Sequence, residues 1–283
     1  MKTCVVLALF LMAGVSLADI QKRIIGGRRC TPQEEQHYVF LGTTNRTGTR
    51  FICSGSVIGR GRTSSWVLTA AHCDMGGPSF TVKSADRSVE QTVDRAQTYK
   101  HRTADVMLLK LKKLSIRKEV KKVFTRKKLS QPMTPIPLAT GVECRTLRDH
   151  LNANNPVTFR ITARDTQARA VYAHNRTGGN PDVTMCANIT VDRVGPANIV
   201  LQHTGAEQTS HNERFFARPS AGCRMSKGDS GSGFIYNNAL YAVFKGVKIW
   251  YIGTSVIDRE NIAFTICDTD IRRWIDQTMR ARF

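Results

Sequence analysis

Short segments rich in β-branched and aromatic residues recur along this chain, and Gly, Ser, Asn or Pro separates each from the next. Branched and aromatic side chains pack well on a pleated surface, whereas glycine and proline interrupt it, so the pattern predicts strands joined by turns. We therefore expect a mostly β fold, either a sandwich or a barrel. The predicted strands fall within residues 37–43, 51–59, 65–72, 106–114, 157–162, 232–246 and 262–267.

The last residues of the chain follow a different periodicity. Asp268 is a suitable helix cap, and apolar side chains recur after it at positions i, i+3, i+4 and i+8 of one helical face. Those side chains are Ile271, Trp274, Ile275 and Met279. We predict an amphipathic α-helix over residues 268–281, and we interpret the proline-containing stretch 129–141 as a crossing between two halves of the fold.

The first residues have the layout of a secretory signal peptide. Lys2 precedes an apolar stretch, and small residues end at Ala18. The apolar stretch is too short to span a membrane, and no later segment reaches about 18 uninterrupted apolar residues. We predict a signal peptide at residues 1–18, no transmembrane segment, and a secreted, extracellular protein.

The cysteines agree with export. The chain has eight, of which Cys4 lies in the signal peptide, so seven remain. In an oxidising compartment most of them would pair, and an odd number leaves at least one that is free or bonded to another molecule. No two stand in a C-x-x-C spacing, so we expect no metal site, and we expect no cofactor. Sequons mark candidate glycosylation sites at Asn45, Asn175 and Asn188.

The formal net charge of +20 favours anionic partners. Much of it lies in residues 110–128, which hold ten basic residues and one acidic residue. This run is either a solvated basic face or a surface for polyanionic glycans or an anionic cell surface. Nucleic-acid binding is disfavoured, because the run has one aromatic residue, Phe124, and no stacking pattern.

Three residues stand in strings that suit nucleophilic catalysis. His72 ends the strand-like "VLTAAHC", Asp105 begins the strand-like "TADVMLLKL", and Ser230 lies in "GDSGSG". A serine hydroxyl becomes an effective nucleophile when an imidazole takes its proton and a carboxylate orients that imidazole. Taken singly, His72 suits a structural role and Asp105 a capping role. Taken together, the three residues predict a catalytic triad.

These strings resemble those of the trypsin- and chymotrypsin-like serine proteases, and the resemblance covers residues 24–283. The order His, Asp, Ser differs from that of the α/β-hydrolases, and Ser232 breaks their G-x-S-x-G motif. The family fold implies two six-stranded antiparallel β-barrels, about residues 24–135 and 136–267, followed by the C-terminal helix. The matching motifs are "RIIGG", "CSGSVI", "LTAAHC", "ADVMLLKL" and "GDSG".

The resemblance also implies a role for each site residue. Ser230 would be the nucleophile, His72 the general base and then acid, and Asp105 the orienting carboxylate. The backbone N–H groups of Gly228 and Ser230 would form the oxyanion hole.

Activation by cleavage follows from the same resemblance. Residues 19–23 would be a short propeptide, and a cut after Arg23 would free the amine of Ile24. In the family this new cation is buried against the aspartate before the nucleophile, which here is Asp229, and orders the oxyanion hole.

For the disulfides, the resemblance implies that Cys53 pairs with Cys73. Cys186 with Cys223 is the second pair that we expect. Cys30, Cys144 and Cys267 stay unassigned.

The specificity pocket departs from that of trypsin. Arg224 stands at the family's pocket floor, where trypsin-like enzymes have an aspartate for basic substrates, and Lys227 follows it. Either these cations select an acidic side chain, or the pocket is shallow and accepts small apolar ones, or Arg224 faces the solvent. The other expected substrate-binding residues are Phe244, Gly246 and Ile262.

Two functions follow from the sequence. The first is a secreted serine endopeptidase that acts on proteins or peptides, without trypsin-like specificity. The second is a protease-fold binding protein with weak or no catalysis, which acts through its basic surface on anionic glycans or cell surfaces.

Overall fold

The computed structural model describes residues 27–45, 48–60, 64–112, 133–164, 184–197, 210–218, 225, 228–252 and 255–281. Several residues singled out above lie outside the described residues. They are the signal peptide, Arg23, Ile24, Asn175, Cys223, Arg224, Lys227 and residues 113–128 of the basic run.

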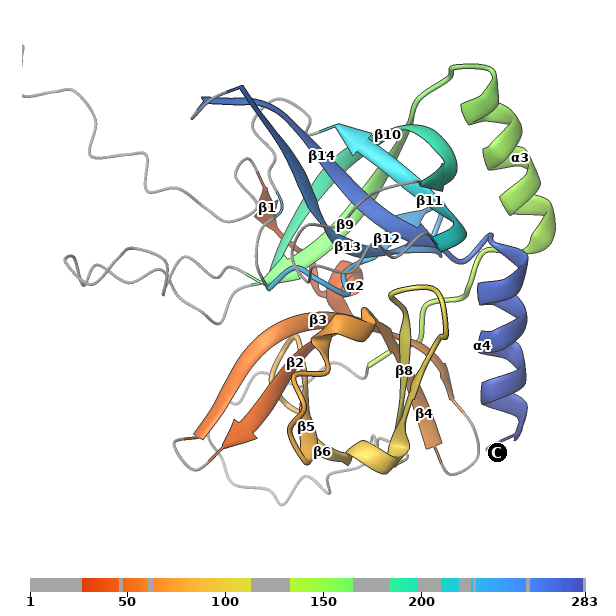
Figure 1. Cartoon of the computed structure of the whole chain (residues 1–283). Helices are drawn as coiled ribbons and strands as arrows, with labels where there is room; N and C mark the ends of the chain where they lie inside the picture. Colours follow the sequence, from red (N-terminus) through yellow and green to blue (C-terminus); the bar gives the residue numbers. More distant parts are fainter. Residues whose placement is uncertain are drawn as a thin grey trace, which may run out of the picture.

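Two antiparallel sheets lie next to each other and divide the molecule into two halves (Figure 1). The sheet of the second half closes into a six-stranded barrel, because β9 pairs with β10 as well as with β12. Phe159 lies in its core, with ring centroids 5.4 Å from Phe215 and 6.0 Å from Phe234. The six strands are β9 (Val157–Arg164), β10 (Thr184–Ala197), β11 (Ser210–Arg218), β12 (Gly233–Tyr236), β13 (Ala239–Ile252) and β14 (Ser255–Thr265).

The sheet of the first half is a curled half-barrel. Its strand order is β6-β5-β2-β3-β4-β8-β7, so β6 and β7 lie at the ends. Trp66, Val57 and Leu41 are fully buried in its core. The strands are β2 (Tyr38–Asn45), β3 (Gly48–Arg60), β4 (Ser64–Thr69), β5 (Ser79–Ser84), β6 (Glu90–Asp94), β7 (Thr98–Lys100) and β8 (Met107–Lys112). Two 3₁₀ helices, η1 (Ala71–Cys73) and η2 (Arg95–Gln97), follow β4 and β6.

Strands are present at each of the seven segments predicted from the sequence. The crossing segment is also where the proline pattern placed it. Ile136 N–H donates to Val57 O in the first half at 2.8 Å, and Ala139 N–H donates to Leu240 O in the second half at 3.0 Å. The segment is therefore hydrogen-bonded to both halves.

The C-terminal helix is α4 (Thr269–Ala281), which confirms the prediction. Asp268 caps it by accepting hydrogen bonds from the backbone N–H groups of Asp270 and Ile271. Trp274 packs edge-to-face against His101 of the first half, and Ile275 is fully buried. Figure 1 shows α4 along the side of the molecule. No helix among the described residues is long and apolar enough to cross a membrane.

A second long helix, α3 (Gly141–Asn152), was not among the expectations. A capping box begins it: Thr140 Oγ1 accepts from Glu143 N–H, and Glu143 Oε2 accepts from Thr140 N–H. Cys144 in α3 forms a disulfide with Cys267, which follows β14. This bond ties α3 to the start of α4.

The N-terminal segment belongs to the second half. Strand β1 (Arg28–Arg29) pairs with β10, although these residues fall in the range expected for the first barrel. In this register Arg28 is opposite Cys186, which places Cys30 within disulfide range, with a Cα–Cα distance of 4.9 Å. Cys30 and Cys186 form the disulfide, so the expected bond between Cys186 and Cys223 is wrong.

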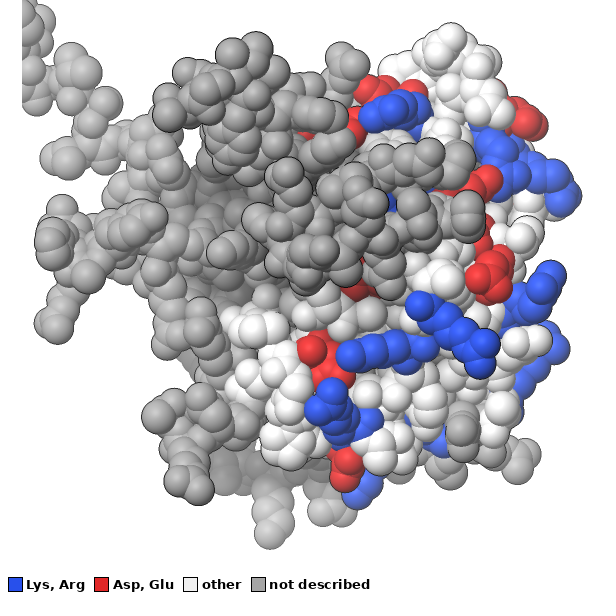
Figure 2. Space-filling model, viewed as in Figure 1, with Lys and Arg blue, Asp and Glu red and all other residues white. Residues whose placement is uncertain are grey.

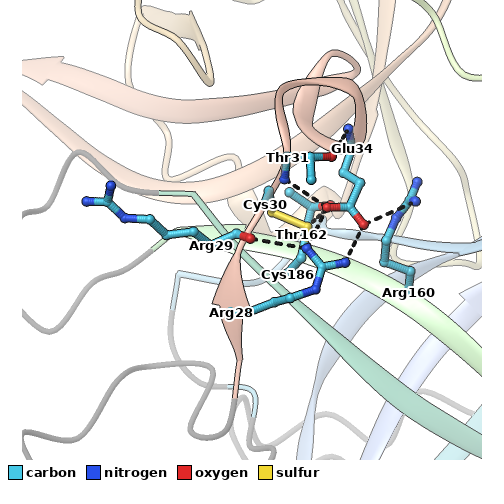
Figure 3. Close-up of polar contacts among 8 residues, drawn as sticks. All are labelled: Arg28, Arg29, Cys30, Thr31, Glu34, Arg160, Thr162 and Cys186. Atoms are coloured by element: carbon cyan, nitrogen blue, oxygen red, sulfur yellow. Dashed lines mark hydrogen bonds and ion pairs between the residues drawn. A yellow bond between two sulfur atoms is a disulfide. The ribbon is translucent and has the colours of Figure 1, made fainter.

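A carboxylate holds the same segment in place (Figure 3). Glu34, in the short helix α2 (Pro32–Glu35), accepts two hydrogen bonds from the Arg28 guanidinium, and Arg160 of β9 lies 3.7 Å away. The hydrogen bonds from Arg28 lower the pKa of Glu34 to about 2, against the opposing effect of burial. The N-terminal segment is thus bound to the second barrel by a strand pairing, a disulfide and an ion pair.

Charge on the described surface is mixed. On the face drawn in Figure 2, Lys and Arg side chains lie among Asp and Glu side chains. Of the basic run, the structure describes Lys110 and Lys112 at the end of β8, and Lys110 Nζ lies 5.8 Å from the centroid of the Trp66 ring.

Candidate active site

His72 and Asp105 form a two-point contact within the first half. Asp105 Oδ1 accepts a hydrogen bond from His72 N–H at 2.7 Å, and Asp105 Oδ2 lies 2.6 Å from His72 Nδ1. The carboxylate therefore fixes both the backbone and the ring of His72. Because Nδ1 donates to the carboxylate, the neutral imidazole has an acceptor at Nε2.

Asp105 is 13% exposed at its side chain, whereas the His72 side chain is 45% exposed. Burial opposes ionisation of Asp105, but the hydrogen bonds from His72 and the charges of His72 and Lys245 outweigh it. They hold the pKa of Asp105 below its ordinary value. The site therefore keeps a buried carboxylate charged beside an accessible imidazole.

A disulfide braces the histidine. Cys73, next to His72 in η1, is bonded to Cys53 of β3, as the resemblance implies. The ligand atoms of these three residues lie within 4.8 Å of one another. Both sulfur atoms are used in the disulfide, so the group is a structural brace for His72 rather than a metal site.

Ser230 lies in a turn that requires glycine on both sides. Gly228 has φ +100° and Gly231 has φ +88°, which L side chains rarely adopt. A Cβ on Gly231 would lie 2.0 Å from the carbonyl oxygen of Ser54. The turn therefore packs directly on β3 of the first half, where Ser54 N–H donates to Ser230 O at 2.8 Å.

The Ser230 hydroxyl donates to the carbonyl oxygen of Lys245 at 3.4 Å. The described residues His72 and Ser230 are not hydrogen-bonded to each other in this structure. Such contacts are often long in a free active site and shorten when substrate binds. Rotation about the Ser230 Cα–Cβ bond is the movement that would change the hydroxyl's partner.

Ser54 is a site residue that the sequence reasoning missed. Its hydroxyl donates to the carbonyl oxygen of Gly228 at 3.0 Å, and the Tyr38 hydroxyl lies 2.6 Å from it. Because the single proton of Ser54 goes to Gly228 O, the Tyr38 hydroxyl must be the donor in the second bond. Ser54 and Tyr38 are buried, so this relay fixes the peptide between Gly228 and Asp229 from the first half. Its only sequence signal is the Ser in "CSGSVI".

Comparison with known proteins shows which family this chain belongs to. Residues 24–275 match the family model described as Trypsin. The chain belongs to the Trypsin family. Among its relatives are a snake venom serine protease, gussurobin, of Gloydius ussuriensis, and Trypsin I-P1 of Gallus gallus. The first is 28% identical over 259 residues, which are 87% of this chain and 84% of that protein. The second is 24% identical over 293 aligned residues, which cover 96% of this chain and 98% of that protein.

Solved structures show the same fold. The neuropsin structure, a serine protease expressed in the limbic system of mouse brain, has a TM-score of 0.53 at 20% identity, and the match covers 89% of this chain and 98% of neuropsin. A structure titled HL collagenase has a TM-score of 0.58 at 18% identity over 90% of this chain and 98% of that one. This Trypsin-family chain therefore has the family's fold.

Two expected pocket residues of this Trypsin-family chain are buried in the second barrel. Phe244 is 1% exposed and stacks on Phe234 with ring centroids 6.5 Å apart. Ile262 is 2% exposed, and it pairs in register with Gly246, which is half-buried. The aspartate before the serine, Asp229, is fully buried as well.

Two basic residues near the site were not singled out from the sequence. Lys245, between Phe244 and Gly246, has its Nζ 5.3 Å from the centroid of the Phe264 ring. Arg214 of β11 stacks on the same ring at 4.6 Å. An isolated Arg or Lys in a strand is ordinarily exposed, so no local pattern indicated that Arg214 is buried and Lys245 half-buried.

Proposed function

We propose that this Trypsin-family chain is a secreted serine endopeptidase that hydrolyses peptide bonds through His72, Asp105 and Ser230. The observation that carries the proposal is the two-point contact of Asp105 with His72, at 2.7 and 2.6 Å. That contact leaves Nε2 of His72 as the free basic atom. A histidine with a structural role alone would not require a buried, ionised carboxylate that contacts both its backbone N–H and its ring.

The reaction then has two halves. Nε2 of His72 takes the proton of Ser230 as the serine oxygen bonds to the substrate carbonyl carbon, and His72 returns the proton to the amine when the C–N bond breaks. Water repeats the attack on the acyl-enzyme with His72 again as base, which frees Ser230. Asp105 stabilises the imidazolium in both halves and stays ionised.

The oxyanion hole is proposed at the backbone N–H groups of Gly228 and Ser230. Its support is the glycine-dependent turn and its hydrogen bonds to Ser54. Donors held by a buried network need little rearrangement when charge develops on the substrate oxygen, which is the main source of oxyanion-hole catalysis.

Activation would follow cleavage between Arg23 and Ile24. The support is the complete burial of Asp229, because a buried carboxylate is stabilised by a cation placed beside it in the interior. Secretion is proposed from the predicted signal peptide and from the three disulfides, which form and persist in oxidising compartments. Of the candidate glycosylation sites, Asn188 is exposed on β10.

Specificity is proposed to differ from that of trypsin. Arg224 and Lys227 precede Ser230 in the sequence, and Lys245, whose carbonyl oxygen accepts a hydrogen bond from the Ser230 hydroxyl, adds a described cation. These cations would repel a basic substrate side chain.

A second candidate is a protease-fold binding protein with weak or no catalysis, which acts through the basic run on anionic glycans. It is favoured by the hydrogen bond of Ser230 to Lys245 O, because the hydroxyl proton is then donated to a carbonyl rather than to His72. One relative that covers 38% of this chain, from Bothrops jararacussu, is named a snake venom serine protease homolog.

Labelling by a fluorophosphonate after cleavage at Arg23 separates the two candidates. The endopeptidase predicts covalent modification of Ser230, with Ser230→Ala and His72→Gln as unlabelled controls that keep the fold. If a folded, cleaved protein does not react with the probe, the result supports the second candidate, a binding protein without catalysis. Retention on heparin at rising salt, compared with a variant in which five lysines of the run are neutralised, then tests the glycan surface.

A further inference from the structure

Arg214 is a buried cation in the second barrel. Its side chain is 1% exposed, and its Nε and Nη1 atoms have no hydrogen-bond partner among the described residues. The guanidinium stacks on Phe264, its partner in register on β14. A buried charge is unfavourable unless an opposite charge is near, so an apolar residue would suit this position better if packing were its only role.

A hydrogen bond between the two halves brings the Asp105 loop to Arg214. Thr103 Oγ1 donates to Asn212 Oδ1 at 2.7 Å. Thr103 precedes Asp105 by two residues, and Asn212 precedes Arg214 by two. Residues two apart on a strand share a face, and Asn212 and Arg214 are both buried while Glu213 between them is half-buried. The Asp105 loop therefore lies on the face of β11 that carries Arg214.

The charges of His72 on η1 and Lys245 on β13 act on Asp105, and the charge of Asp105 acts in turn on Arg214 of β11. Burial lowers the pKa of both Lys245 and Arg214, and the negative charge of Asp105 opposes that shift in each.

A second carboxylate that contacts this part of β11 is already engaged. Asp268 accepts hydrogen bonds from Asn212 Nδ2 and Glu213 N–H, and it caps α4. Asp105 is therefore the counterion of Arg214 that these contacts support.

We propose that Arg214 is a positioning residue for Asp105, whose buried charge, together with that of Lys245, extends the activity of the His72–Asp105 pair to lower pH. The inference rests on the proposed function, because it concerns the protonation state in which the pair works. A proton taken up at the His72–Asp105 contact adds positive charge there, and nearby cations disfavour that uptake.

The test is the pH dependence of kcat/KM in the cleaved protein. In Arg214→Met the acid limb of the profile should rise by about one pH unit, since a cation near the pair is removed. Activity on that limb then falls about tenfold relative to the plateau, while the plateau stays within about threefold. Arg214→Lys, which keeps the charge, should restore the limb, and Lys245→Met should move it in the same direction as Arg214→Met.

A matched control is Arg193→Met. Arg193 on β10 also stacks on a phenylalanine, Phe216, at 4.2 Å, and it pairs with Glu260 instead of Asp105. The acid limb of the kcat/KM profile of Arg193→Met should therefore stay where it is in the wild type. The melting temperature is measured beside the pH profile, because loss of a buried counterion and loss of packing can both lower it, whereas only the loss of the charge moves the acid limb. A lower melting temperature with an unmoved acid limb would overturn the proposal.

An inactive wild type would refute the proposed function without deciding the role of Arg214. In that case the His72 ring titration is followed by NMR in the full chain, with the resonance assigned by its loss in His72→Gln. A higher midpoint in Arg214→Met than in wild type and Arg214→Lys supports the proposal, and equal midpoints in the three proteins overturn it.

Discussion

The hydroxyl of Ser54 donates a hydrogen bond to the carbonyl oxygen of Gly228 at 3.0 Å, so a strand of the first half holds the turn that carries Ser230 in the second. Tyr38 completes the relay by donating to Ser54. The turn that carries the proposed nucleophile is thus held by both halves, so a substitution in either half can alter its position.

Ser54→Ala should lower kcat by about tenfold and leave KM within about twofold, because a loosened oxyanion hole affects the transition state more than the bound substrate. It also removes the hydrogen bonds of Ser54 with Gly228 O and the Tyr38 hydroxyl, at a cost of about 1–3 kcal/mol in unfolding free energy. Steady-state kinetics and denaturant unfolding measure the two effects. Ser56→Ala is the control, since Ser56 lies two residues along β3 and its buried hydroxyl has no partner among the described residues. An equal loss of kcat in both variants would contradict the relay.

Asp105→Asn should lower kcat by about 10⁴-fold, because the amide cannot stabilise the imidazolium of His72 or fix its tautomer. Asp74→Asn serves as the comparison. Asp74 follows η1 and pairs with Lys100 at 2.8 Å and Arg95 at 3.1 Å, so its loss should affect stability and leave kcat within about threefold. A small effect of Asp105→Asn on kcat would show that His72 does not work as a base.

Gly231→Ala should destabilise the protein by about 2–4 kcal/mol and abolish activity, because it combines a positive φ with a buried backbone clash. The new Cβ would lie 2.0 Å from Ser54 O and 2.2 Å from Thr69 Oγ1, and the first of these atoms belongs to the backbone of a strand. In Gly77→Ala the nearest atom to the new Cβ is Ser79 O at 3.8 Å, so stability should stay within about 0.5 kcal/mol. Thermal unfolding measures the stability of the two variants, and an equal stability of both would contradict the predicted clash at Gly231.

Glu34→Gln should lower the melting temperature at neutral pH. The pKa of Glu34 is lowered from 4.5 in the unfolded reference to about 2 in the fold, so its stabilisation is fully present above pH 4.5. It is lost as the pH falls from about 4.5 to about 2, and the two proteins should converge over that window. Glu90→Gln removes a more exposed ion pair with Lys83 and should have a small effect at every pH. A constant difference for Glu34→Gln across the window would contradict the role of its charge.

The sequence predicted the strands and the C-terminal helix because their signals are local. Alternation, turn residues and the cap at Asp268 each act within a few residues, and the structure has elements at those places. Thr140 and Glu143 at the start of α3 match a capping box, which is also a local signal. Gly141 and the prolines before it are poor helix formers, so the helix was not predicted.

The errors concern contacts set by tertiary structure. The partner of Cys186 depends on β1 adding to β10, and a two-residue strand has no periodicity to read. The proposed role of Arg214 depends on the contact of Thr103 with Asn212, which joins two segments that are distant in sequence. Hydrogen-bonded loops and barrel closure, rather than residue patterns, determine these contacts.

The disulfide between Cys30 and Cys186 sets the local concentration of the new N-terminus that the proposed cleavage would create. Ile24 is six residues from Cys30, so its amine stays within about 20 Å of a fixed point on the second barrel. A short tether of this kind gives an effective concentration in the millimolar range, independent of how dilute the secreted protein becomes. The excised peptide has no such tether, because the disulfide lies on the other side of the cut, and it diffuses away. The disulfide beside β1 would therefore make the insertion of the new amine unimolecular after the cut.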